Sequence, residues 1–174
     1  LECFKKVYPY ADYITVNISS PNTPNLRSLH QKENFLPLFE ALHLARNEAK
    51  YRNPIFIKLS PDEDEQIIAE ILVAIKKFEF DGVITSNTTI KKDNLRYSGQ
   101  HNLEGGLSGR PLLDKSNELL KFTHSHAPDL LKIGVGGVDS KESFNSKLDN
   151  GASLVQIYTS FIYQGPEIVS KLLR

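Results

Sequence analysis

Polar side chains recur at regular places along this 174-residue chain, each time directly after a short apolar run. The five polar segments are residues 17–24, 58–61, 86–89, 134–137 and 158–160. They supply hydroxyls, amides, glycines and one cation, Lys58. Such a set suits a ligand with polar edges that gains negative charge during a reaction, because a fixed cation and aligned donors stabilise charge as it develops.

Lys58 is the most informative of these residues, because it falls inside the apolar run 55–59. A buried ammonium costs free energy unless it is paired. One interpretation is that the side chain extends to solvent along its alkyl stem or pairs with a carboxylate. Two functional interpretations also remain open: an amine that forms a Schiff base, or a fixed cation beside a ligand.

The glycines are concentrated in the second half of the chain, where all ten lie at or after residue 82. Two clusters stand out, at 105–109 and 134–137. A glycine-rich turn between a strand and a helix lets backbone N–H groups approach a phosphate closely. In barrel folds the phosphate site commonly follows the last two strands. We therefore predict a phosphate site at Gly136, Gly137, Tyr158 and Thr159; the alternative is that these glycines only form tight turns.

Other potential catalytic residues give weaker signals. Ser20 lies in a Ser-Ser-Pro-Asn turn with no histidine nearby, so its chemistry alone favours a turn or capping hydroxyl. The five histidines are scattered, and we expect no metal site. A single cysteine, Cys3, excludes a disulfide framework.

The elements that position these groups alternate between two types. Strand-like runs are expected at 14–18, 55–59, 82–86, 131–135 and 154–158, and helices at 33–50, 62–80, 113–126, 140–150 and 166–173. This alternation predicts a parallel α/β sheet, either open and doubly wound or closed as a (β/α) barrel. The runs show almost no polar alternation, which is typical of strands buried on both faces. In both architectures the active face lies at the carboxyl ends of the strands.

Composition narrows the class of protein. Twenty-one basic residues balance 21 acidic ones, which argues against a nucleic-acid partner. No apolar stretch is long enough to span a membrane. The absence of Met leads us to expect that the chain is processed or part of a longer protein.

Six ordered motifs carry a resemblance to a known family. They are residues 11–27, 57–62, 81–89, 105–112, 133–138 and 151–158, so the resemblance extends along essentially the whole chain. In order and spacing they resemble the dihydroorotate dehydrogenase family, in its quinone-dependent class 2 form. Ser86 stands where that family usually has Thr, a change that keeps the hydroxyl.

The resemblance implies a (β/α)8 TIM barrel that binds FMN at its strand ends. Residues 1–174 would be the C-terminal portion of this single domain, contributing about the last five β/α units. The first three units, and N-terminal helices that contact quinone and the membrane surface, would lie outside the chain. The implied reaction is oxidation of (S)-dihydroorotate to orotate with quinone as acceptor, in pyrimidine (UMP) biosynthesis. The implied location is peripheral to the inner membrane, on its cytoplasmic side in a bacterium. The alternative is the mitochondrial inner membrane.

The resemblance also assigns residues. Ser20 matches the family's catalytic base, which would take a proton from C5 of dihydroorotate, and this assignment replaces the capping interpretation. The expected FMN contacts are Asn17, Lys58, Ser86, Gly109, Gly137, Tyr158 and Thr159. The expected substrate contacts are Asn22, Asn87 and Thr88. Two alternatives stay open: a phosphate-binding barrel enzyme without flavin that uses Lys58 as a Schiff-base amine, and an inactive isolated half barrel.

Overall fold

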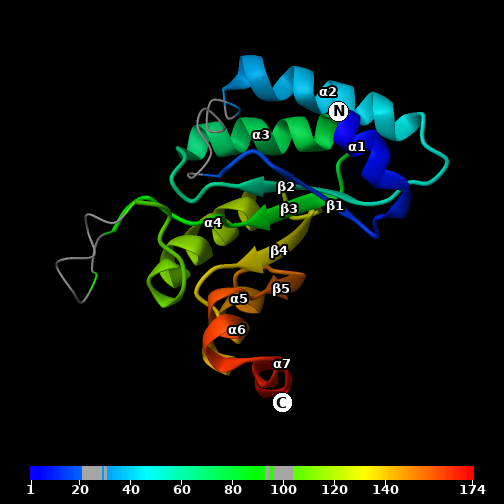
Figure 1. Ribbon diagram of the computed structural model, residues 1–174. Helices are drawn as coiled ribbons and strands as arrows, with labels where there is room; N and C mark the ends of the chain where they lie inside the picture. Colours follow the sequence, from blue (N-terminus) through cyan, green and yellow to red (C-terminus); the bar gives the residue numbers. More distant parts are fainter. Residues whose placement is uncertain (21–28, 30, 93–94, 96–103) are drawn as a thin grey trace.

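Five parallel strands form one sheet in the computed structural model, which describes residues 1–20, 29, 31–92, 95 and 104–174 (Figure 1). The strands are β1 (Ile14–Asn17), β2 (Ile55–Leu59), β3 (Gly82–Thr85), β4 (Leu131–Val135) and β5 (Leu154–Gln156). They lie side by side in the order in which they occur along the chain. The predicted parallel α/β organisation is therefore confirmed, and the carboxyl ends of the strands meet along one edge.

The helices are α1 (Glu2–Val7), α2 (Lys32–Asn47), α3 (Glu65–Lys77), α4 (Leu113–His126), α5 (Lys141–Asp149), α6 (Thr159–Gln164) and α7 (Glu167–Leu173). Ser140 caps α5 in a reciprocal box with Ser143. Sequence analysis missed α1 and α6, because six residues are too few to show a helical apolar period. Within the described ranges, no helix is both long and apolar enough to cross a membrane.

The two faces of the sheet have different neighbours. Ile55, Ile57 and Leu59 of β2 belong to the large core that includes α2 and α3. Phe56 lies in a separate small cluster with Ile84 and Ile133. Because successive side chains of a strand point to opposite faces, Lys58 shares the face of Phe56 and not that of the helices.

Burial on both faces is confirmed for the central strands and wrong for the outer ones. Nearly all of β2 and β3 is buried, whereas β1 and β5 each retain exposed residues. The physical reason is position, since β1 and β5 are the two edge strands of the described sheet. An edge strand has a neighbour on one side only and keeps part of its surface in solvent.

A buried ion pair fastens the helical layer to the sheet. Arg46 of α2 is only 2% exposed, and its Nη1 donates to Asp81 Oδ2 at 3.0 Å. Its Nη2 donates to the Glu79 carbonyl at 2.6 Å. The same Asp81 oxygen accepts from the backbone N–H of Ile55 at 2.8 Å. One guanidinium thus joins α2, the turn after α3 and the first residue of β2.

We expect Arg46→Met to lower the free energy of unfolding of the full chain by about 3 kcal/mol, since it leaves a partly buried carboxylate without its cation. Urea denaturation would measure the loss. Arg52→Met is the matched control, because the Arg52–Glu79 pair is exposed (59% and 57%) and should contribute less than about 1 kcal/mol. Equal losses in the two variants would contradict this account.

Candidate active site

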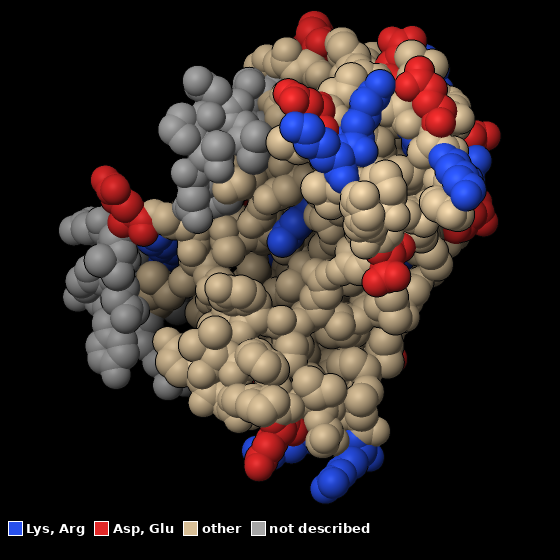
Figure 2. All heavy atoms as spheres, turned by 45° about the vertical axis from the view of Figure 1, so that its right-hand side comes forward, with Lys and Arg blue, Asp and Glu red and all other residues tan. Residues whose placement is uncertain are grey.

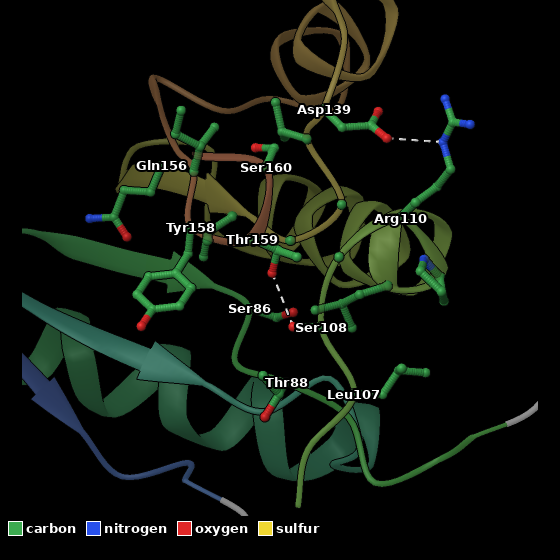
Figure 3. A pocket seen from close by; sticks show the side chains of 18 of the residues that line it. Ser86, Thr88, Leu107, Ser108, Arg110, Asp139, Gln156, Tyr158, Thr159 and Ser160 are labelled. Carbon is green, nitrogen blue, oxygen red and sulfur yellow. Dashed lines mark hydrogen bonds and ion pairs between the residues drawn. The ribbon is translucent and has the colours of Figure 1, made fainter. Parts of the chain in front are cut away.

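A cavity of about 800 Å³ opens at the carboxyl ends of strands β2 to β5 (Figure 3). Its walls come from the segments after those strands and from residues 106–112. The predicted site residues that line it are Lys58, Ser86, Asn87, Thr88, Gly109, Gly137, Tyr158 and Thr159. The structure thus brings together residues spread over a hundred positions of the chain.

Asn17 lies beside the cavity and not in its wall. Its Oδ1 accepts from Asn87 Nδ2 at 3.2 Å and from Ser19 Oγ at 3.1 Å. Asn87 Nδ2 also donates to Ser19 Oγ at 3.0 Å. Ser20 is half-buried and directly follows this network. The predicted roles of Ser20 and Asn22 stay predictions; Asn22 lies outside the described residues.

Lys58 brings a positive charge to the cavity. It is half-buried near the end of β2, in register with Asn17 of β1. Burial lowers the pKa of its ammonium group. No hydrogen bond or ion pair joins it to any other residue in the described part of the chain. Among the residues that the structure describes, Lys58 therefore pairs with no carboxylate, and its amine is available to a ligand.

The glycine clusters form a backbone cradle. Gly109, Gly136 and Gly137 have φ angles of 76°, 112° and 80°, in the left-handed region that favours glycine. A Cβ on Gly137 would lie 2.5 Å from the Cα of Leu113, at the start of α4. The two clusters meet near Thr159, whose Oγ1 donates to Ser108 Oγ at 3.0 Å (Figure 3).

Two buried hydroxyls in the cavity wall have no hydrogen-bond partner among the residues described. They are Thr88 Oγ1 and Ser160 Oγ. An unpaired buried hydroxyl is costly, so a ligand that supplies a partner is favoured. Sequence analysis included Ser160 in the polar segment 158–160 but did not single it out; the signal was its place directly after Thr159.

Asp62 is a correction to the sequence interpretation. The helix expected over 62–80 would put Asp62 in its first turn, but α3 begins at Glu65 and the Asp62 side chain is only 4% exposed. It accepts hydrogen bonds from Thr89 Oγ1 at 2.5 Å and from Lys115 Nζ. Burial alone would raise its pKa, but these donors outweigh that effect and lower it. The cluster ties the ends of β2 and β3 to α4.

Charged side chains are unevenly distributed over the face of the molecule shown in Figure 2. In Figure 2, blue and red side chains gather toward the upper and lower ends of the visible face, and the hollow between them is mostly uncharged. Arg110 and Asp139 pair at one side of the cavity, with Nε and Oδ2 3.1 Å apart. The cavity therefore combines a phosphate-type backbone cradle, one unpaired cation and neutral donors, a set suited to a phosphorylated ligand with a polar ring.

A family model and curated relatives all match this chain to dihydroorotate dehydrogenases. The family model for dihydroorotate dehydrogenase matches residues 1–174. The dihydroorotate dehydrogenase (quinone) of Idiomarina loihiensis is 44% identical over 99% of this chain and 53% of its own length. That of Methylobacillus flagellatus is 44% identical over 100% of this chain and 53% of its own. The chain spans about half the length of these curated relatives.

Solved structures show the same architecture. Ligand-free DHODH from Eimeria tenella superposes with a TM-score of 0.92 at 30% identity, over 98% of this chain and 52% of that one. Its complex with ferulenol gives a TM-score of 0.92 at 28% identity. The alternation of strands and helices is thus that of a TIM barrel and not of an open doubly wound sheet. By the family model and by both kinds of relative, the chain belongs to the dihydroorotate dehydrogenase family.

Proposed function

We propose that the protein containing this chain oxidises (S)-dihydroorotate to orotate with FMN as cofactor and quinone as acceptor, in pyrimidine biosynthesis. The observation that carries the proposal is Lys58, a cation with no partner among the described residues, in a cavity that also holds a glycine cradle. Support comes from relatives named dihydroorotate dehydrogenase (quinone). Residues 1–174 would form the last five β/α units, and a segment outside them would contact quinone and the inner membrane surface.

The cavity fits FMN by the chemistry of its walls. Gly109, Gly137 and Thr159 lie where backbone N–H groups and a hydroxyl can hold a phosphate. The Ser160 hydroxyl, buried and unpaired in the described structure, offers a further donor. Asn17, Ser86 and Tyr158 would border the rest of the cofactor. When bound, FMN supplies an acceptor for the hydride that leaves C6 of dihydroorotate.

Lys58 would hold its ammonium group beside the flavin ring. The charge is fixed by the rigid strand β2, so little reorganisation is needed when negative charge develops. Its position in register with Asn17 places an amide next to the cation. Together they provide directional donors for the polar edge of the ring.

Ser20 would accept the proton from C5 of the substrate. It directly follows the Asn17–Ser19–Asn87 network, which holds this segment against the end of β3. Thr88, with its unpaired buried hydroxyl, and the Asn87 amide would bind the carboxylate and amide edges of the pyrimidine. Asn22 completes the proposed substrate contacts.

A second candidate function uses Lys58 as a nucleophile in a phosphate-binding barrel without flavin. The observation that favours it is the lowered pKa of Lys58, because burial makes the neutral, nucleophilic amine more accessible. Borohydride reduction would trap a substrate on Lys58 if this function were correct. Bound flavin seen in the visible spectrum of the purified protein would argue for the first function instead.

In the full-length protein that contains this chain, we expect Ser20→Ala to slow orotate formation by about 100-fold or more, the usual contribution of a general base, while FMN stays bound. Steady-state rates with saturating quinone and the flavin absorbance would show both effects. Ser125→Ala, on the exposed end of α4, is the control and should behave as wild type. A comparable rate in Ser20→Ala at neutral pH would rule out Ser20 as the base.

We expect Lys58→Met to raise the Kd for FMN by about tenfold, which equals about 1.4 kcal/mol, because the cation is lost and the side-chain length is kept. Titration of apoprotein with FMN, followed by flavin fluorescence, gives the value. Lys76→Met, which removes an exposed lysine of α3, should leave the Kd unchanged. An unaltered FMN affinity in Lys58→Met would place Lys58 away from the flavin.

A further inference from the structure

A buried lysine lies beneath the glycine turn that follows β4, outside the lining of the cavity. Lys147 of α5 is 0% exposed. Its stem packs under β4, where a Cβ on Gly134 would lie 3.1 Å from Lys147 Cδ. Burial lowers its pKa to about 8, although the carboxylate of Asp114 acts in the opposite direction. A buried ammonium is costly, and one side-chain hydroxyl offsets part of that cost by accepting a hydrogen bond from it.

That partner is Ser116 of α4, which is also fully buried. Lys147 Nζ donates to Ser116 Oγ in a short hydrogen bond. The hydroxyl has two acceptors within reach, the Leu113 carbonyl at 2.8 Å and the Gly136 carbonyl at 3.0 Å. Because the ammonium occupies a lone pair of Oγ, the single hydroxyl proton is shared between these two carbonyl oxygens.

The Gly136 carbonyl belongs to the peptide that links Gly136 to Gly137. This peptide is trans, so its N–H points away from its C=O. With the carbonyl turned inward to Ser116, the N–H of Gly137 is turned toward the cavity, which both glycines line. Within the described chain no residue accepts a hydrogen bond from this N–H. Two adjacent glycines can easily adopt the opposite peptide orientation, so the orientation requires an anchor.

We propose that Lys147, acting through Ser116, is a positioning residue that holds the Gly136–Gly137 peptide with its N–H directed at the phosphate of the bound cofactor. The charged donor polarises the chain of hydrogen bonds, which strengthens the N–H at its far end. This inference rests on the proposed function, because it takes FMN as the ligand of the cradle.

The test compares FMN with riboflavin, which has the same ring and lacks the phosphate. Apoprotein of the full chain is titrated with each ligand, and flavin fluorescence gives the two Kd values. For Lys147→Met we expect the Kd for FMN to rise about tenfold and that for riboflavin to change by less than about twofold. Should this variant fail to fold, Lys147→Met combined with Ser116→Ala removes both polar partners and allows the same measurement.

Lys132→Met is the matched control. Lys132 is a second buried lysine, 2% exposed, and its Nζ donates to the carbonyls of Pro128 and Leu130 at the opposite end of β4. The control should lose stability but keep the wild-type ratio of the two affinities. If Lys147→Met keeps that ratio as well, the inference is overturned. A wild type that does not prefer FMN over riboflavin would overturn the proposed cofactor, and this inference with it.

Discussion

Parallel hydrogen bonding between neighbouring strands determines where each functional group of this chain lies. The register pairs Asn17 with Lys58 and Thr85 with Gly134. A shift of β2 by one residue would turn its side chains to the opposite faces. Lys58 would then enter the apolar core against the helices, and Ile57 would replace it on the cavity side. The chemistry of the cavity therefore depends on backbone pairing, and the helices maintain that pairing from behind.

Charged side chains between the helices and the sheet stabilise this pairing of strands. Arg46 pairs with Asp81 near the amino ends of the strands. Asp62 binds Lys115 near the carboxyl ends, and Lys147 reaches Ser116 under the glycine turn. Each of these groups has at least one partner within the protein, whereas Lys58 has no partner in the structure as described. That contrast distinguishes Lys58, the lysine proposed to serve a ligand, from the charged groups that stabilise the fold.

Local patterns predicted the elements well, because runs such as residues 55–59 and the apolar stripe of α3 reflect burial directly. They also identified Lys58, since a lysine within an apolar strand can be recognised from the sequence alone. Patterns could not reveal Asp62 or Lys147, whose partners lie 53 and 31 residues away and are set by packing. Alternation alone left barrel and open sheet equally possible, because both have the same local period, and the solved relatives decided between them.

The order of the strands in the sheet follows their order along the chain, so each new strand docks on the one made just before it. Such contacts close short loops, and the sheet can grow unit by unit during synthesis on the ribosome. The turn after β4 and residues 158–160 after β5 are made after the carboxyl ends of β1, β2 and β3. A nascent chain therefore presents Lys58 and Phe56 well before the glycine turn after β4 exists. If the protein binds the cofactor proposed above, that binding would follow the assembly of the earlier strands and could not guide it.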